Sequence, residues 1–147
     1  MNSGSYYQMV EDFHDKHGLI AGQKLNVNEY RQTILFRSKL IAEECHELVE
    51  SLYNLDQRGM KKEDLMHVAK EICDVMYVAI GTAVAFNIDI DNAFKEVHRS
   101  NMSKEVAAKV GGKVQKGLSY VPANLTEAVK NAHLPTQCQQ ALRQESP

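Results

Sequence analysis

The sequence has little that would break a helix, build a sheet or cross a membrane. None of its three prolines occurs before Pro122, so the first 121 residues can form long helices. Period-two alternation of β-branched residues is nearly absent, which argues against a sheet. No run of about 18 apolar residues occurs, and the first residues lack the basic and apolar regions of a signal peptide. We therefore expect an all-α, cytoplasmic protein with no membrane partner.

Cysteine content and net charge exclude further classes of protein. Cys45, Cys73 and Cys138 are odd in number and show no CxxC spacing, which argues against a disulfide framework or a zinc site. The formal net charge is -2 over 147 residues, of which 24% are charged and 44% hydrophobic. This balance is typical of a globular domain and does not favour nucleic acid as a partner.

Apolar periodicity and end signals predict four helices. They cover about residues 6–17, 28–57, 62–86 and, from a cap at Asp89 or Asp91, residues up to about 104. Glycines and Pro122 predict a loop over residues 106–122, and TEAVKNAH one short closing helix. We expect one bundle-like domain over residues 1–132, followed by a flexible tail over 133–147, which is polar and aperiodic.

The stretch IAEECHELVE carries four glutamates beside apolar residues. In a helix, Glu43 and Glu47 share one face, while Glu44 lies nearer the main apolar stripe. In the next helix, Glu71 lies on the border of an apolar stripe and Asp74 follows at i+3. A short turn near residue 59 makes the two helices antiparallel, and it is 12 residues from both Glu47 and Glu71. We therefore expect these carboxylates to converge at one depth.

Such a group of carboxylates is costly without a counter-ion, because neighbouring negative charges disfavour one another's ionised form. All-oxygen ligands suit Mg²⁺, with Mn²⁺ as a possible substitute. EExxE alone is more often a solvated helix face, and it is the ExxD at matching depth that favours a metal site. His46 follows Glu43 at i+3, but the helix with Glu71 and Asp74 offers no matching histidine, which weakens a ferritin-like di-iron interpretation.

Cations and amides follow the carboxylates in the chain. Asn101 and Lys104 share a face near the end of the fourth helix, Lys113 and Lys116 lie in GGKVQKG, and Tyr120 comes soon after. Lysine pairs well with phosphate, although lysines in a loop are more often simply solvated. No P-loop signature is present. Beside a carboxylate-bound metal, these residues suggest phosphoryl chemistry on a nucleotide.

At these motifs the sequence resembles the all-α nucleoside triphosphate pyrophosphohydrolase superfamily, which contains MazG and its relatives. The superfamily motifs EExxE and ExxD are present as EECHE and EICD. FHDKHG, VHRSNMSK and GKVQKGLSYVPANL are similar to the branch with phosphoribosyl-ATP pyrophosphohydrolase-like proteins and MazG-like dUTP pyrophosphatases, so the resemblance covers roughly residues 6–130. It implies a MazG-type fold and Mg²⁺-dependent cleavage of a nucleoside triphosphate between its α and β phosphates.

The resemblance also implies roles for individual residues. Glu44 either completes the metal shell or activates the attacking water, and Glu47 is the other candidate for the base. The linker EVAAKVG lacks the acidic DG-type turn that is usual in the superfamily. This departure affects the expected placement of Lys113 and Lys116 more than the metal site. The implied metal ligands are Glu43, Glu47, Glu71 and Asp74. The implied substrate contacts are Asn101, Lys104, Lys113 and Lys116 to phosphate or sugar, Tyr120 to the base, and His14 at the border of the nucleotide pocket, although such a histidine is more often ordinary packing.

The expected function is cleavage of a deoxynucleoside triphosphate, with dUTP or dCTP favoured, for house-cleaning of the nucleotide pool. One alternative is hydrolysis of phosphoribosyl-ATP, and another is a non-enzymatic helical module whose acidic edge binds a basic partner. Ala79 and Ala83 leave a small-residue patch that another helix can approach. Because members of the superfamily commonly assemble, we expect a homodimer or homotetramer.

Overall fold

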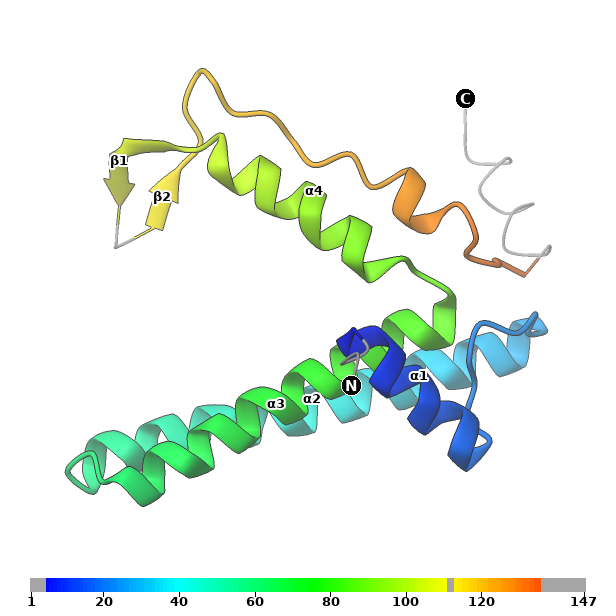
Figure 1. Cartoon of the computed structure of the whole chain (residues 1–147), viewed down its shortest axis with the longest axis horizontal. Coiled ribbons are helices and arrows are strands. Elements are labelled where there is room, and N and C mark those ends of the chain that lie inside the picture. Colours follow the sequence, from blue (N-terminus) through cyan, green and yellow to red (C-terminus); the bar gives the residue numbers. More distant parts are fainter. Residues whose placement is uncertain (1–4, 111–112, 136–147) are drawn as a thin grey trace. The chain divides into compact units, whose positions relative to one another are not determined.

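Helices make up most of the regular structure. The structure is a computed structural model that describes residues 5–110 and 113–135. Its helices are α1 (Tyr6–His17), α2 (Val27–Gln57), α3 (Lys62–Phe86) and α4 (Ile90–Met102) (Figure 1). The predicted bounds of α1 and α3 are confirmed, α2 begins one residue earlier than predicted, and α4 ends at 102 instead of about 104. The predicted all-α class is confirmed.

A short antiparallel hairpin follows α4, in the segment where the sequence predicts a loop. Strand β1 (Glu105–Val110) pairs with β2 (Lys113–Gln115), and Val110 lies opposite Lys113. The sequence signal for it is weak: two short valine-bearing runs on either side of a Gly-Gly dipeptide, which suits a tight hairpin turn. The predicted closing helix is a single 3₁₀ turn, η1 (Glu127–Val129).

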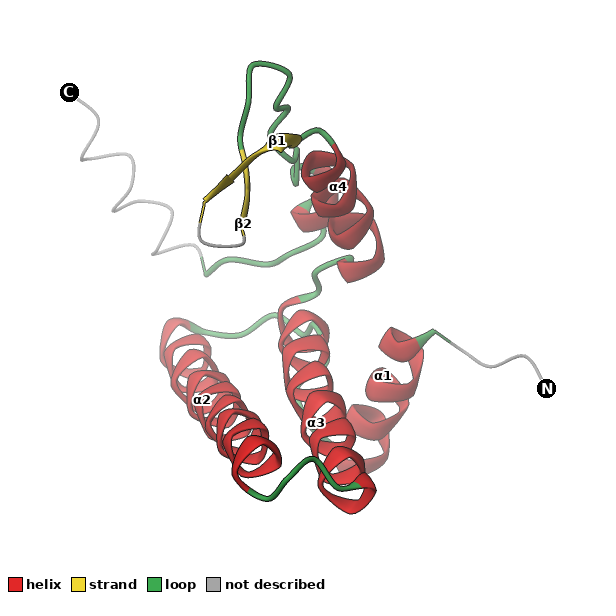
Figure 2. Ribbon diagram, turned by 90° about the vertical axis from the view of Figure 1, so that its left-hand side faces the viewer, coloured by secondary structure: helices red, strands yellow, loops and turns green. Residues whose placement is uncertain are grey.

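Contacts divide the chain into two compact units. The first contains residues 5–87 together with 132–135, and the second contains residues 88–131. In the first unit, α2 and α3 lie side by side in opposite directions and α1 packs against α3 (Figure 2). The single domain predicted over residues 1–132 stays a prediction. Beyond residue 135, the predicted tail lies outside the described residues.

Local capping interactions fix where the helices begin and how they turn. Asn26 and Glu29 form a capping box at the start of α2. Of the two caps considered for α4, the structure selects Asp89, whose carboxylate accepts from the backbone N–H of Asn92 at 3.0 Å. Gly59, at φ +81°, adopts the left-handed conformation in the turn between α2 and α3. This short turn makes the two helices antiparallel, as expected from the sequence.

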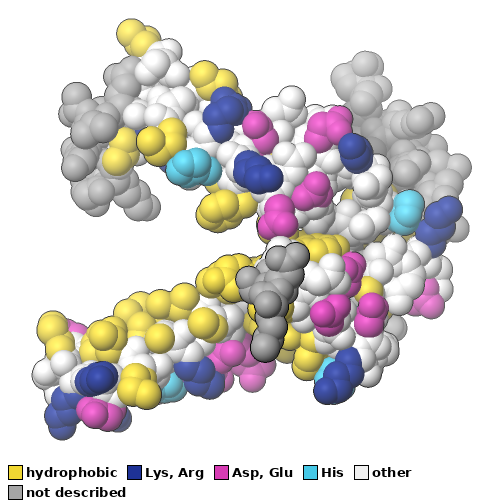
Figure 3. Space-filling view, in the orientation of Figure 1, with side chains coloured by type: hydrophobic (Ala, Val, Ile, Leu, Met, Phe, Trp, Pro, Cys, Tyr) yellow, Lys and Arg dark blue, Asp and Glu magenta, His cyan; other side chains and the backbone are white. Residues whose placement is uncertain are grey.

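The single chain buries only part of its apolar surface. Val10, Val68 and Val84 are buried, but many large apolar side chains of α2 and α3 are not. In Figure 3, hydrophobic side chains gather along α3 on the side that faces the viewer. Within the described residues no single helix is long and apolar enough to cross a membrane, and only α3 and α4 counted together pass that test. The large exposed apolar side chains include Phe36, Val49, Leu52, Leu65, Ile72 and Met76.

Candidate metal centre

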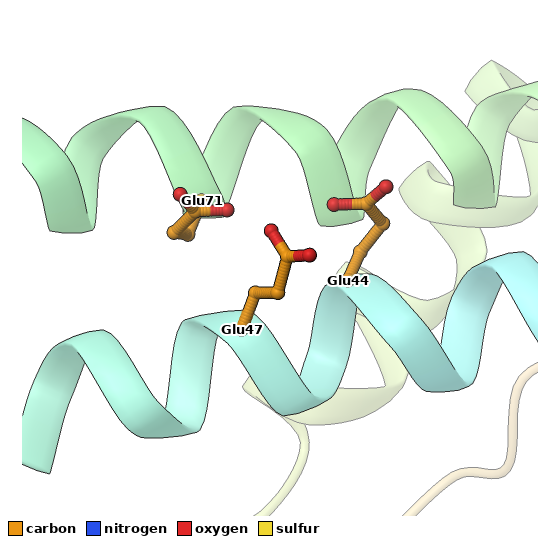
Figure 4. A group of neighbouring side chains, drawn as sticks. All are labelled: Glu44, Glu47 and Glu71. Carbon is orange, nitrogen blue, oxygen red and sulfur yellow. The ribbon is translucent and has the colours of Figure 1, made fainter.

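Three glutamates meet between α2 and α3. Glu44 and Glu47 come from α2 and Glu71 comes from α3, and their carboxylates point into the space between the two helices (Figure 4). One carboxylate oxygen of each residue lies within 4.8 Å of those of the other two. The common depth predicted for Glu47 and Glu71 from their equal distance to the turn is therefore confirmed.

Glu71 is more deeply buried than its sequence position on the border of a stripe suggests. Its side chain is 1% exposed. Its Oε1 lies 3.0 Å from His67 Nδ1 and 3.0 Å from Lys70 Nζ. Its Oε2 is buried without a hydrogen-bond partner among the described residues. A buried oxygen of a carboxylate is costly to leave unpaired, so this atom is suited to contact a cation.

The electrostatic environment of Glu44 is also that of a crowded anionic site. Loss of contact with water raises the pKa of its carboxyl, and the negative charges of Glu47, Asp74 and Glu43 raise it further. The ammonium of Lys70 acts in the opposite direction. Three other carboxylates thus act on Glu44, and of these only Glu47 belongs to the close group.

Asp74 and Glu43, which the resemblance also implies as metal ligands, lie outside the close group. Asp74 Oδ2 is 2.6 Å from Lys70 Nζ, and Glu43 is exposed on α2. The hydrogen bonds to Asp74 and then to Glu71 hold the pKa of Lys70 well above its ordinary value. The structure therefore brings three of the predicted ligands together and pairs a fourth with a lysine.

The donor atoms of the close group fit a hard divalent cation. All three side chains offer oxygen, which is what Mg²⁺ and Mn²⁺ prefer. A cation here would satisfy the unpartnered Oε2 of Glu71 and would offset the desolvation and the carboxylate repulsion that raise the pKa of Glu44. Glu44, Glu47 and Glu71 are therefore the residues that could hold a metal ion.

The second unit brings three of the six predicted substrate-binding residues, Lys104, Lys116 and Tyr120, near one another. Lys116 Nζ lies 4.6 Å from the centroid of the Tyr120 ring, within the range of a cation–π contact. Ser100 Oγ donates to the Tyr120 hydroxyl at 3.3 Å. That hydrogen bond, followed by the charges of Lys116 and Lys104, lowers the pKa of Tyr120. Two lysines and a tyrosine thus form a small cationic group.

Among the described interactions, Asn101 and Lys113 have no side-chain contact with Tyr120. Asn101 lies in the last turn of α4, where its side chain is exposed and its carbonyl accepts from the backbone N–H of Lys104 at 3.2 Å. Lys113 begins β2, and its side chain lies outside the described residues. Their contacts with a substrate stay predictions.

His14 lies in a cavity of about 330 Å³ that Arg37 also lines. The imidazole is 3% exposed, and its Nδ1 lies 2.6 Å from the carbonyl oxygen of Ile20. Arg37 is 7% exposed, and its guanidinium donates to the Val78 carbonyl at 2.7 Å and to Thr82 Oγ1 at 3.1 Å. No carboxylate among the described residues pairs with it, and burial lowers its pKa. The cavity therefore presents an unusual buried cation.

Sequence patterns alone do not single out Lys70, His67 or Arg37. Lys70 had a usable signal, because it directly precedes Glu71 and lies four residues before Asp74, the spacing of a helical ion pair. For Arg37 the signal is faint, since its burial depends on how α3 packs beside it. A methyl group at Gly81 would collide with the Arg37 guanidinium, so the absent side chain of this glycine provides the space.

Comparison with protein families identifies a matching family. The model of a protein family described as phosphoribosyl-ATP pyrophosphohydrolase matches residues 17–101, more than half of the chain. The matched range contains Glu44, Glu47 and Glu71 and ends at Asn101. No curated protein matches the chain.

Proposed function

The chain belongs to the phosphoribosyl-ATP pyrophosphohydrolase family of the MazG-like all-α superfamily, and from this we propose that it cleaves a nucleoside triphosphate between the α and β phosphates. Members of this family are metal-dependent pyrophosphohydrolases that act on nucleotides. The observation that carries the proposal is the group of Glu44, Glu47 and Glu71 around a buried, unpartnered carboxylate oxygen. The products would be the nucleoside monophosphate and pyrophosphate.

We assign Mg²⁺ to this group, with Mn²⁺ as a substitute. Glu44, Glu47 and Glu71 would be the central ligands, and Glu43 and Asp74 would be the further ligands that the motif implies. When bound, the ion would supply positive charge against the phosphates and lower the pKa of a bound water. The role of the two helices is to hold the carboxylates at one depth before the substrate arrives.

Glu44, through the carboxylate oxygen that does not hold the metal ion, is our first choice for the proton acceptor, with Glu47 as the alternative. Its raised pKa brings its carboxylate nearer the working pH, which suits a general base. Glu44→Gln and Glu47→Gln should separate the two assignments. Loss of the base removes the acidic limb of the pH profile of kcat, whereas loss of a ligand alone weakens metal binding and leaves that limb in place.

We propose that the residues around Tyr120 contact the substrate. The phosphates would be bound by Lys104, Lys113 and Lys116. Asn101 would contact a phosphate or the sugar, and Tyr120 would contact the base. The clustering of two lysines beside Tyr120 supports this role, because lysine is a compact point charge that pairs with phosphate. His14 would border the nucleoside from its cavity beside Arg37.

A deoxynucleoside triphosphate, dUTP or dCTP first, is our proposed substrate, and house-cleaning of the nucleotide pool is the proposed purpose. The second candidate is phosphoribosyl-ATP, and the description of the matching family model favours it. A purely binding role is less well supported, because a helical module with an acidic edge needs no buried glutamate with an unpartnered oxygen.

A substrate panel tests the proposal. Canonical dNTPs, NTPs and phosphoribosyl-ATP would each be incubated with the protein and Mg²⁺, and pyrophosphate and nucleotide products would be separated by chromatography. We expect monophosphate and pyrophosphate in equal amounts, and no turnover in EDTA. Phosphoribosyl-ATP as the best substrate would establish the second candidate. Diphosphate and inorganic phosphate as products, or no turnover of any nucleotide, would contradict both.

We also propose that the protein is a homodimer or homotetramer. The support is the apolar surface that one chain leaves exposed on α2 and α3, with Leu52 at 48% and Ile72 at 45% exposed. Size-exclusion chromatography with light scattering should show a multiple of 16.6 kDa. A species of 16.6 kDa alone would overturn this proposal.

A further inference from the structure

We infer that Lys70 is the built-in counter-ion of the carboxylate group, and that it competes with a divalent cation for Asp74. This inference rests on the proposed metal site and adds a positioning residue that lies outside both acidic motifs.

One ammonium group connects the two acidic residues of ExxD. Lys70 Nζ lies 3.0 Å from Glu71 Oε1 and 2.6 Å from Asp74 Oδ2. A lysine ammonium is compact and has three donors, so it can satisfy two carboxylates at once. The side chain of Lys70 is 60% exposed, whereas that of Glu71 is 1% exposed. The ammonium therefore reaches the buried carboxylate from the solvent side and can leave without disturbing the core.

The two oxygens of Glu71 differ in their surroundings. His67 Nδ1 and Lys70 Nζ both approach Oε1, and Oε2 is buried without a partner among the described residues. A cation bound by Glu44, Glu47 and Oε2 therefore needs none of the atoms that Lys70 uses. A cation that also takes Asp74 Oδ2 must displace the ammonium from that oxygen.

The balance of charge around the carboxylates also indicates that Lys70 competes with a divalent cation. Ion pairs to the five motif carboxylates come, within the described part of the chain, from Lys70 and His67. Lys70 is thus the main positive charge held against several negative ones before any metal ion binds. Removing it should leave the ion-free protein with greater repulsion and should make the site that includes Asp74 more attractive to a divalent cation.

The test is a Mn²⁺ titration followed by electron paramagnetic resonance, in which the signal of free aqueous Mn²⁺ falls as ions bind. It is done without nucleotide, so that turnover plays no part. Lys70→Met removes the charge and keeps an unbranched side chain, and Lys70→Arg keeps the charge. Lys62→Met, on the same helix without an ion pair among the described residues, controls for the loss of one positive charge.

We expect Lys70→Met to bind Mn²⁺ about two- to fivefold more tightly than the wild type, the range that an exposed ion pair allows. Lys70→Arg and Lys62→Met should bind as the wild type does. In EDTA, Lys70→Met should also melt at a lower temperature and gain more from added Mn²⁺. A merely structural lysine would not produce tighter metal binding when removed.

The outcomes separate this inference from the proposed metal site. Wild-type binding of Mn²⁺ with unchanged or weaker binding by Lys70→Met would overturn the competition and leave the metal site standing. Lys70→Arg behaving like Lys70→Met would also overturn it, because the positive charge would not be the cause. If the wild type bound no Mn²⁺ at all, the metal site itself would be wrong.

Discussion

The α2–α3 pair and the segment around Tyr120 carry the two halves of the proposed chemistry, and they hold their charged side chains in different ways. Glu71 is 1% exposed between two long helices, whereas Lys116 is exposed after a hairpin strand and rests on a tyrosine ring. Metal ligands need a fixed geometry, which packed helices provide. Lysines that bind phosphate as point charges need a less fixed geometry. The difference implies that substitutions in the first region should affect chemistry and those in the second should affect substrate affinity.

The largest effect should come from Glu71→Gln. It keeps the size of the side chain but removes the buried negative charge, so we expect pyrophosphate release to fall by at least about 100-fold, beyond the usual effect of groups that only orient a metal ligand. The measurement is kcat with saturating Mg²⁺, alongside the thermal unfolding temperature in EDTA. In the absence of metal, removal of a buried negative charge that repels the carboxylates of Glu44 and Glu47 should raise that temperature.

Glu63→Gln is the matched control for this change. It removes a carboxylate from the first turn of the same helix, outside the close group. Full activity in Glu63→Gln with loss in Glu71→Gln supports the assignment. Wild-type turnover in Glu71→Gln would show that the close group is not the catalytic centre.

A smaller effect is expected from Lys116→Met in the second unit. Loss of one charge-assisted contact to phosphate should raise KM by about tenfold or more, with a lesser change in kcat. Steady-state kinetics with the best substrate of the panel provide the measurement. Lys130→Met is the control, because Lys130 lies in the same unit and pairs with Glu127 at 2.8 Å. An unchanged KM in Lys116→Met would remove this lysine from the substrate site.

The smallest effect is on the pH dependence of the free energy of unfolding. The ionised carboxylate of Glu44 in the first unit lowers stability, whereas that of Glu96 in the second unit raises it. The folded pKa of Glu44 is raised by loss of water contact and then by nearby carboxylates, so its ionisation opposes folding above that pKa, and this cost is relieved as pH falls through it. The folded pKa of Glu96 is lowered by its hydrogen bonds to Arg99 and then to the backbone of Asn124. The stabilisation that Glu96 contributes is therefore fully present above the pKa of this residue in the unfolded chain, and it is lost as pH falls through the folded pKa.

Urea unfolding in EDTA from neutral pH to about pH 3, below the ordinary pKa of a glutamate, tests both signs. Relative to the wild type, Glu44→Gln should gain stability at neutral pH and lose that advantage in acid. Glu96→Gln should be less stable at neutral pH and approach the wild type in acid. Identical pH dependence in the wild type and Glu44→Gln would show that neither the desolvation of Glu44 nor its crowding by other carboxylates affects stability.

The same contrast explains what the sequence could and could not predict. Helical periodicity and one short turn were enough to place Glu47 and Glu71 at one depth, because a helix advances by a constant rise per residue. They did not predict the complete burial of Glu71 or the pairing of Asp74 with Lys70, which depend on tertiary packing and side-chain rotamers. The hairpin β1–β2 was missed because its strands are short and lack clear alternation, so that glycine content dominated the prediction.

The most direct test of the central claim is a crystal of the protein soaked with Mn²⁺ and a non-hydrolysable dNTP, examined by anomalous scattering. We predict an anomalous peak between α2 and α3, within about 2.5 Å of carboxylate oxygens from Glu44, Glu47 and Glu71. A nucleotide phosphate should complete the ligands of that ion. With Mn²⁺ at saturating concentration, a map without a peak at these three residues, or with its only peaks elsewhere, would contradict the account.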